Sequence, residues 1–536
     1  MTTSVDAPDA TSTAGHTVMT HREVLNVMSG LLLAMFVAML SSTIVSNALP
    51  RIMVDLGGNQ SQYTWVIAAT LLAATATTPI WGKLSDRMSK KLLVQLSISV
   101  FVVGSIAAGF STSTEALIGF RALQGLGLGG LQALVQIVMA FMVSPRERGR
   151  YMGYFGAVMG VATVGGPLLG GFIVDASFLG WRWCFWVGAP IALAALILLQ
   201  KTLHLPVVKA ETKIDWWGAL LIPGGVSVLL IWVTLAGKTF AWVSWTSAAL
   251  VAASLVLIAL ALLVERRVPD PVVPPRLVRQ RTMILAIVAS VSVGTAIFGA
   301  SVFFGPYFQV SRGFSPTRSG LLTVPLVLGL MVATTVAGRL VSKTGKWKRY
   351  LVAGTGLIVV GLALLGTIDH STNLVLIGVY MTILGAGVGM SMQNLVLAAQ
   401  NGLSYSDLGA GTSTITFFRS LGGAAGVSVL GAILAAHVTD LITKGLASIP
   451  GASEATQSGG STSLDLSALP PEVRVIVQHA YGDATARIFL VAAVIALVAF
   501  VAVLFIKETA LRTTVVAPDE DVTANVAGSR RNEPAT

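Results

Sequence analysis

A succession of long apolar segments constrains this chain more than any other feature. A helix that crosses a bilayer needs about 20 mostly apolar residues. Fourteen such segments can be drawn, at residues 27–49, 62–82, 92–110, 116–142, 151–174, 183–200, 216–236, 245–264, 284–308, 319–341, 350–368, 374–398, 409–436 and 486–506. Only 11% of the residues are charged, against about a quarter in a typical soluble domain. The sequence therefore predicts an all-α integral membrane protein.

The distribution of basic residues orients these segments. If the N-terminus is cytoplasmic, 25 of the 35 Lys and Arg residues fall in tails and loops on the cytoplasmic side and eight fall on the other side. This asymmetry follows the positive-inside rule. It predicts that both termini are cytoplasmic, and it explains the net charge of +11 without a nucleic-acid partner. The remaining two, Arg121 and Arg419, lie within apolar segments.

Two patterns recur at nearly the same spacing. The loop GKLSDRMSKK from Gly82 is similar to GRLVSKTGKWK from Gly338, and GLGLG at 125–129 is similar to GAGVG at 385–389. The alternative to a duplication is chance recurrence in a chain with 55 glycines. A duplication predicts two six-helix bundles with two inserted helices between them. The expected divisions are a disordered tail at 1–25, a bundle at 26–200, the insertion at 201–282, a bundle at 283–509 with an external loop at 437–485, and a disordered tail at 510–536.

Arg121 begins a polar arc on the fourth segment. At about 100° per residue, Gln132 lies about 20° from Arg121, Gln136 about 60° and Gln124 about −60°. An arginine within a membrane helix costs roughly 2.5–3.5 kcal/mol on insertion scales. We therefore expect the arc to face a watery cavity or polar partners. The alternative is a structural arginine that binds carbonyl groups of a neighbouring helix.

Four motifs resemble those of the major facilitator superfamily, and within it the fourteen-helix drug:proton antiporters. They are LSSTIVSNALP at 40–50, GKLSDRMSKK at 82–91, RALQGLGLGG at 121–130 and GVATVGGPLLGG at 160–171. The last is similar to the fifth-helix motif of exporters, and we single out Gly160, Gly165, Gly166, Pro167 and Gly170. Ser89 departs from the usual glycine, Ser46 from the usual asparagine, and Ser41 from the aspartate of many members.

The resemblance implies roles for the second motif and for the coupling ion. Gly82, Asp86, Arg87 and Lys90 would form a gating loop whose charges hold one state of the transporter, unless they only fix topology. Protons would be the coupling ion, with no cofactor. Arg121 is the coupling candidate, yet the middles of the fourteen segments hold no Asp, Glu or His. Asp55 and Glu115 are the nearest candidate proton carriers, and both also fit ordinary surface carboxylates.

The expected substrate cavity is mostly apolar and adaptable. Its candidate lining residues are Ser41, Asn47, Gln124, Gln132, Gln393, Asn394, Met39 and Tyr307. Arg419 fits either a family position or a side chain that extends to the cytoplasmic edge. With a single cysteine, Cys184, the chain has no internal disulfide and no cysteine-based zinc cluster.

The function that these features predict is proton-coupled export of hydrophobic or amphipathic drugs across the cell membrane by alternating access. The expected partners are the lipid bilayer and the substrate. The protein is expected to be a monomer, and an adaptor protein bound at the external loop is a further option. The alternatives are export of an endogenous metabolite, lipid or self-made antibiotic, import of a nutrient, and a membrane-embedded enzyme. No metal site and no nucleophile with a base is recognisable at membrane depth.

Overall fold

The computed structural model describes residues 20–58, 60–176, 178–205, 215–237, 239–268, 271, 274–447 and 470–514. Within these ranges the chain is helical and forms no β-strand beyond one isolated bridge. Thirteen spans in the described residues are long and apolar enough to cross a membrane, and a shorter apolar helix at Leu220–Leu235 adds a fourteenth. The predicted fold class is therefore confirmed: an all-helical membrane protein with two six-helix bundles and two inserted helices.

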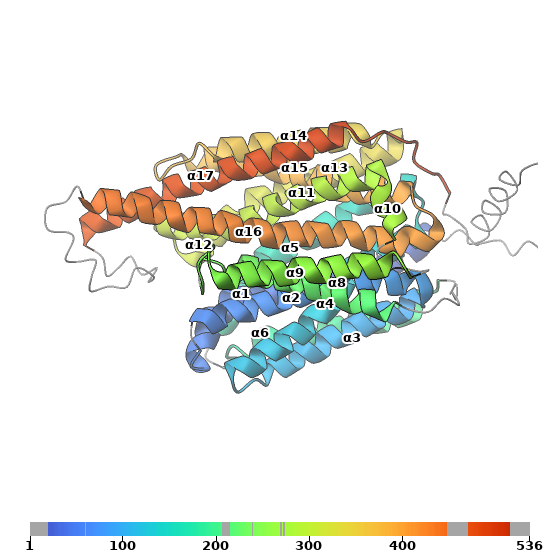
Figure 1. The fold of residues 1–536 in the computed structure, drawn as a ribbon, viewed down its shortest axis with the longest axis horizontal. Coiled ribbons are helices and arrows are strands. Elements are labelled where there is room, and N and C mark those ends of the chain that lie inside the picture. The colour runs from blue at the N-terminus through green and yellow to red at the C-terminus, as the bar shows by residue number, and fades with distance from the viewer. Residues whose placement is uncertain are drawn as a thin grey trace, which may run out of the picture.

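The first bundle and the inserted helices come from the N-terminal part of the chain (Figure 1). The first bundle consists of α1 (His21–Asp55), α2 (Gln60–Arg87), α3 (Lys90–Gly109), α4 (Thr114–Met142), α5 (Pro145–Asp175), α6 (Trp183–Trp186) and α7 (Gly188–Thr202). The inserted pair is α8 (Trp216–Leu235) and α9 (Trp245–Glu265). The short helix α10 (Pro275–Arg279) leads to the second bundle.

The second bundle occupies the C-terminal part of the chain. It consists of α11 (Arg281–Pro306) with the π-helical turn η1 (Tyr307–Ser311), α12 (Pro316–Leu322), α13 (Val324–Thr344), α14 (Lys348–Leu365), α15 (Leu374–Asn401), the short turn η2 (Tyr405–Asp407), α16 (Leu408–Ala447) and α17 (Pro471–Leu504). The long ends of α16 and α17 project together at the left of Figure 1.

Helix packing is the same in the two bundles. In the first, α2 and α3 pack on α4, and α1 packs on α5 and α7. In the second, α13 and α14 pack on α15, and α11 packs on α16 and α17. Between the bundles, α2 meets α16 and α5 meets α13. Each contact thus has a counterpart in the other half, as a duplication predicts.

The repeated glycine motif makes this equivalence close. A Cβ added to Gly125 or Gly129 would lie 2.4 Å or 2.3 Å from a backbone oxygen of α2, and one on Gly127 would meet the α3 backbone at 2.5 Å. In the other half, Gly385 and Gly389 meet α13 backbone oxygens in the same way. The motif is therefore needed because two helices approach α4, and two approach α15, too closely for any side chain.

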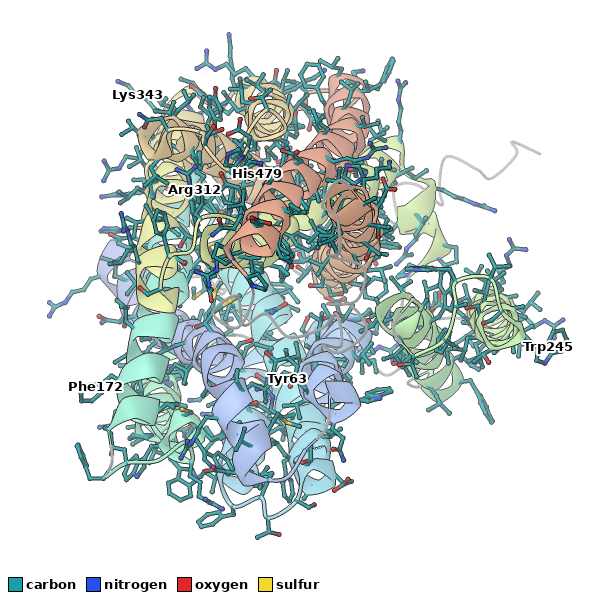
Figure 2. All side chains as sticks on the ribbon, turned by 90° about the vertical axis from the view of Figure 1, so that its left-hand side faces the viewer. Tyr63, Phe172, Trp245, Arg312, Lys343 and His479 are labelled. Carbon is teal, nitrogen blue, oxygen red and sulfur yellow. The ribbon has the colours of Figure 1, made fainter. Side chains whose placement is uncertain are left out.

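The inserted helices lie beside the junction of the bundles. α8 contacts α2 of the first bundle and α16 of the second, and α9 contacts α8. Viewed along the bundle, the pair stands to one side, and Trp245 at the start of α9 lies at its outer edge (Figure 2). Trp245 is 87% exposed, as expected for a side chain at the lipid boundary.

Several helices are longer than the apolar segments suggest. α16 continues to Ala447 and α17 begins at Pro471, so much of the predicted external loop at 437–485 is helical. α1 begins at His21 because Thr20 and Glu23 form a reciprocal capping box, which places residues 21–25 of the predicted tail in the helix. Hydropathy detects the part of a helix within lipid, whereas backbone hydrogen bonding continues into polar turns outside it. Residues 1–19 and 515–536, which make up most of the predicted tails, lie outside the described residues.

Candidate functional site

Arg121 lies inside the first bundle, on α4, with 2% of its surface exposed. Its Nη1 donates to Gln124 Oε1 at 2.5 Å, and its Nε donates to the carbonyl oxygen of Val66 on α2 at 3.4 Å. Thr70 of α2 in turn donates to the Arg121 carbonyl at 3.0 Å. The guanidinium is thus held by neutral oxygens, which lower the cost of burying the charge without cancelling it.

Gln124 extends this network to two further helices. Its Nε2 donates to Ser41 Oγ on α1 at 3.1 Å and to Ser105 Oγ on α3 at 2.5 Å. Its Oε1 accepts from Arg121, which itself binds α2, so the whole network connects α1, α2, α3 and α4. Ser41, at the position where many similar proteins have aspartate, is therefore one side chain away from Arg121. Ser105 was not predicted, although a serine within an apolar segment at this depth is a usable signal.

The polar arc of α4 divides into two parts. Arg121 and Gln124 are hydrogen-bonded to each other inside the bundle. Gln132 is half-buried, and Gln136 is 3% exposed with no hydrogen-bond partner for its Oε1 among the described residues. The free acceptor at Gln136 marks the part of the arc that can still bind a donor from elsewhere.

The second bundle has its own polar pair on α15. Asn394 is 6% exposed and donates to Met390 O at 2.7 Å. Gln393 is 5% exposed, and its Oε1 has no partner in the described part of the chain. Gln393 lines a cavity of about 10 Å³ between α5, α13 and α15, together with Met159 and Thr334. Gln393 therefore lies where the two bundles meet.

Asp86 joins the two bundles. The segments 83–91, 144–150 and 339–349, which are helix ends and the turns between them, lie at one end of the molecule, which we call the basic face. There the Asp86 carboxylate accepts hydrogen bonds from the backbone nitrogens of Gly409 at 2.7 Å and Ala410 at 2.9 Å. Both nitrogens belong to the first turn of α16, where the helix dipole favours a negative charge. A Cβ on Gly82 would lie 2.7 Å from Gly409 O, so glycine is required for this approach.

Lys90 and Arg87, the two cations predicted to belong to the same gating loop as Asp86, are both buried. Lys90 is 3% exposed, and its Nζ lies 3.9 Å from the centre of the Phe141 ring. This is the geometry of a cation–π contact. Arg87 is 8% exposed at the end of α2. The Lys90 charge therefore lies against the first bundle, and the Arg87 side chain is likewise buried rather than in solvent.

Arg148 is a second connection between the bundles that sequence reasoning missed. It is 2% exposed on α5, and its guanidinium donates to Val143 O at 2.9 Å, Ala140 O at 2.7 Å and Gln400 Oε1 of α15 at 2.7 Å. The Gln400 amide then donates to Thr412 of α16 at 2.8 Å. Its position in a basic loop concealed this role, because the sequence marks such residues as topogenic.

The glycines of α5 face two different partners. A Cβ on Gly149 would lie 2.1 Å from Gly338 O of α13, and one on Gly160 would lie 2.6 Å from Met331. Farther along, Gly166 and Gly170 face α1. The basic half of α5 thus packs across the bundle interface, while its other half packs within the first bundle.

The remaining residues of the predicted exporter motif are placed as follows. Gly165 has room, with Leu40 at 3.8 Å. The side chain of Pro167 lies outside the described residues.

The two candidate carboxylates lie at the end opposite the basic face. Asp55 pairs with Arg51 at 3.5 Å, one turn earlier on α1, and its side chain is 39% exposed. Glu115 accepts from Gln62 at 2.6 Å at an exposed position. Neither contacts the Arg121 network, so the structure does not bring the proposed coupling residues together.

Three further residues predicted to line the substrate cavity are not brought together there by the structure. Tyr307 is fully buried inside the second bundle, where its hydroxyl donates to Asp369 O at 2.7 Å, so it does not line a space between the bundles. Met39 is half-buried on α1 and packs against the core of the first bundle. The side chain of Asn47 lies outside the described residues.

Comparison with known proteins identifies the fold. The sequence profile of the Major Facilitator Superfamily matches residues 31–237 and 216–427. The chain is 33% identical to the multidrug transporter protein MdtP of Bacillus subtilis, over 78% of this chain and 76% of that one. It is 32% identical to the efflux pump dotC of Dothistroma septosporum, over 91% and 85%. The solved structure of the proton:xylose symporter XylE superposes with a TM-score of 0.60 at 14% identity, covering 94% of this chain and all of that one.

Proposed function

Because this chain belongs to the Major Facilitator Superfamily, we propose that it is a secondary active exporter that moves hydrophobic or amphipathic drugs out of the cell in exchange for protons. The two bundles would alternate access to a site between them. Such transport needs no cofactor beyond the coupling proton. It is not an enzymatic reaction.

The observation that carries this proposal is the similarity, over most of the chain, to a transporter named for multidrug transport. MdtP is named for multidrug transport and dotC for efflux. Both share about a third of their aligned residues with this chain, over most of its length. XylE, a proton:xylose symporter, supports the fold and not the direction of transport. Export therefore rests on the sequence relatives and on the fifth-helix motif.

The contacts at the basic face support alternating access. Asp86 binds the first turn of α16, Arg148 binds Gln400, and Ser342 of α13 donates to Arg146 O at 2.7 Å. All three join the bundles on the same side, which is the arrangement expected of a state closed there. We place this face in the cytoplasm and both termini with it, in a monomer of the cell membrane. The segment between α16 and α17 is the candidate attachment point for an adaptor.

Arg121 is the proposed coupling residue. Its charge is buried among neutral groups, so any negative charge that enters the bundle is attracted to it. Asp55 and Glu115 remain the candidate proton carriers on the opposite face. A carboxylate there would act from the side of the transporter opposite the basic face and not by direct contact with Arg121.

The test is transport into proteoliposomes of the purified full chain under an imposed pH gradient, with Arg121→Ala beside the wild type. We expect gradient-driven uptake of a cationic dye by the wild type and its loss in the variant, with insertion and yield unchanged. Transport that ignores the gradient in the wild type would contradict proton coupling. Full transport by Arg121→Ala would assign the arginine a packing role.

Drug export is tested separately in cells. Accumulation of a wide dye panel is compared with and without the gene, before and after an uncoupler. Lower accumulation that the uncoupler abolishes is the expected result. Unchanged accumulation across the panel would contradict the multidrug function and favour a dedicated substrate.

A further inference from the structure

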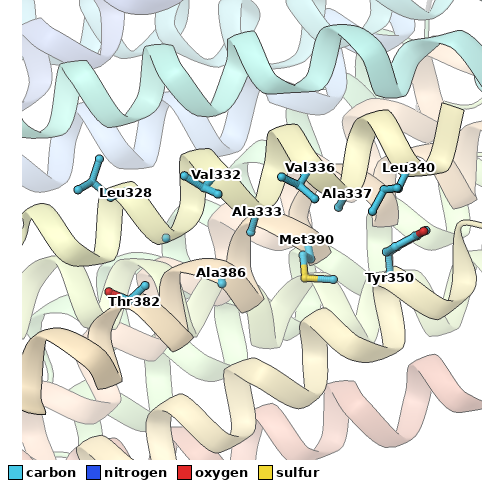
Figure 3. A pocket seen from close by; sticks show the side chains of 11 residues that line it. Leu328, Val332, Ala333, Val336, Ala337, Leu340, Tyr350, Thr382, Ala386 and Met390 are labelled. Carbon is cyan, nitrogen blue, oxygen red and sulfur yellow. The ribbon is translucent and has the colours of Figure 1, made fainter. Parts of the chain in front are cut away.

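A long apolar groove runs along the second bundle. It lies between α13 and α14, with α15 as its floor, and has a volume of about 420 Å³ (Figure 3). Its walls and floor are lined by Leu328, Gly329, Val332, Ala333, Val336, Ala337, Leu340, Tyr350, Thr382, Ala386 and Met390. Small residues give it depth, and its polar side chains, Thr382 and Tyr350, lie toward opposite ends.

The groove opens away from the other helices. Leu328, Val332 and Val336 follow one another at four-residue spacing on α13 and are 52%, 61% and 49% exposed. The neighbouring stripes of α13 pack on α5 and on α15, so this stripe is the one left for lipid. From Leu328 to Leu340 the helix rises by about 18 Å. That length is close to one leaflet, since the whole hydrocarbon core is about 30 Å thick.

One end of the groove is strongly basic. Arg339 lies next to Leu340 and Lys343 lies three residues beyond it, both exposed on α13, and Arg349 lies in the first turn of α14. Lys343 lies at the periphery of the bundle (Figure 2). The Arg349 guanidinium donates to the Tyr350 hydroxyl at 2.6 Å and lies 4.7 Å from the centre of its ring. A cation and a hydroxyl are thereby held at the point where the apolar lining ends.

We propose that this groove binds an anionic phospholipid from the leaflet at the basic face. One acyl chain lies over Ala333 and Ala386, and the phosphate is bound by Arg349, Tyr350 and Lys343. An apolar channel one leaflet long that ends in clustered cations is complementary to a lipid tail with a negative headgroup. The groove opens along the exposed stripe of α13 and not into the space between the bundles, which is where the proposed transport would place a drug.

The experiment counts lipids bound to the purified full chain by native mass spectrometry, with dioleoyl phosphatidylglycerol and dioleoyl phosphatidylcholine as probes. Two variants address the two parts of the proposed site: Lys343→Gln with Arg349→Gln removes charge at the basic end, and Ala386→Leu fills the apolar groove. Matched controls are Arg266→Gln with Arg267→Gln at the end of α9, and Ala253→Leu on the exposed surface of α9.

We expect the wild type to bind phosphatidylglycerol more tightly than phosphatidylcholine. Removing the two charges should weaken phosphatidylglycerol binding by about thirtyfold, since each basic residue near an anionic surface is worth about 1 kcal/mol and about 1.4 kcal/mol corresponds to a factor of ten. Ala386→Leu should remove the bound lipid, and both control proteins should behave as the wild type. Thermal unfolding shows that each variant is folded.

Two results would overturn the proposal. Equal binding of the two lipids by the wild type would remove the headgroup preference. Phosphatidylglycerol binding that survives Ala386→Leu unchanged would place the lipid elsewhere, and a raised KM for dye in that variant would then assign the groove to substrate. The lipid count does not depend on transport, so it stands or fails separately from the export function.

Discussion

Gln124 is the residue on which the buried polar network depends. It accepts from Arg121 and donates to Ser41 and Ser105, so one amide satisfies groups from three other positions. Sequence periodicity placed Gln124 beside Arg121 on α4 but could not show what faced them, because the rotation of neighbouring helices is not encoded in the spacing of one. The absence of an acid at Ser41 was visible in the sequence. The hydrogen bonds that connect Ser41 to Arg121 through Gln124 were not visible in the sequence.

Replacing Gln124 by Leu should therefore disable the protein. The change removes the acceptor of the Arg121 guanidinium and leaves buried polar groups unsatisfied, at a cost of about 1–3 kcal/mol for each. We expect a lower thermal unfolding temperature in detergent and loss of gradient-driven transport. The control is Gln95→Leu, whose amide bonds Gln200 at an exposed position on α3. A Gln124→Leu protein as stable as the control would mean that water replaces the lost bonds.

At the scale of elements, α5 and α13 form an interface that would separate in the proposed transport cycle. Their backbones touch at Gly149 and Gly338, so the closed arrangement depends on the absence of side chains there. The glycine content of α5 was recognisable as a packing signal from the sequence. Which partner each glycine meets was not, because Gly160 faces the other bundle and Gly166 faces α1.

Gly149→Ala should favour opening at the basic face. The new methyl group would meet Gly338 O at 2.1 Å, and overpacking of this kind costs about 1–3 kcal/mol. In a Cys184→Ala background, Ser342→Cys serves as reporter beside this contact. We expect faster maleimide labelling of that cysteine in inside-out vesicles. Gly119→Ala is the matched control, because a Cβ there meets nothing within 4 Å. Equal labelling in both would contradict a tight closed state.

The stability that the loop between α14 and α15 contributes is expected to depend on pH through Asp369. Asp369 Oδ1 accepts from Ser371 N at 2.7 Å, Ser371 Oγ at 2.9 Å and Thr372 Oγ1 at 2.8 Å. These bonds, with that of Thr372 first, lower the pKa of Asp369 to about 2. A depressed folded-state pKa contributes stability above the unfolded value of about 3.9, and that stability is lost as pH falls toward 2.

Asp369→Ala should accordingly lower the unfolding temperature by the same amount at pH 7 and pH 5. The difference from the wild type should shrink below about pH 4, as the wild-type carboxylate is protonated. Thermal unfolding of both proteins over this pH range measures it. A difference that already vanishes between pH 7 and pH 5 would contradict the lowered pKa.

At the scale of the whole molecule, the hydrogen bonds at the basic face connect the two bundles while each bundle keeps its own core. Arg146 on α5 and Ser342 on α13 are joined across the interface, whereas Gln95 and Gln200 are joined within the first bundle. Alternating access requires the first pair to separate and leaves the second pair together.

Cross-linking can distinguish these two pairs. In the Cys184→Ala background, Arg146→Cys with Ser342→Cys should form a link that stops transport until a reductant is added. Gln95→Cys with Gln200→Cys should also form a link but leave transport unchanged. Uptake of dye by proteoliposomes, before and after reduction, is the measurement. Transport that continues with the first pair linked would exclude rigid-body separation at this face.

The sequence by itself determined the helices, their number, their duplication and the placement of Arg121 within a span. Each of these follows from a local property: about 20 apolar residues for a span, a repeated motif for a duplication, and an arginine within an apolar segment. Only the tertiary structure decided that Arg121 is bound through Gln124 to Ser41, that Arg148 and Asp86 join the bundles, and that Tyr307 lies inside the second bundle. These depend on how one helix is rotated and placed against another, and that arrangement is set by packing among residues far apart in the chain.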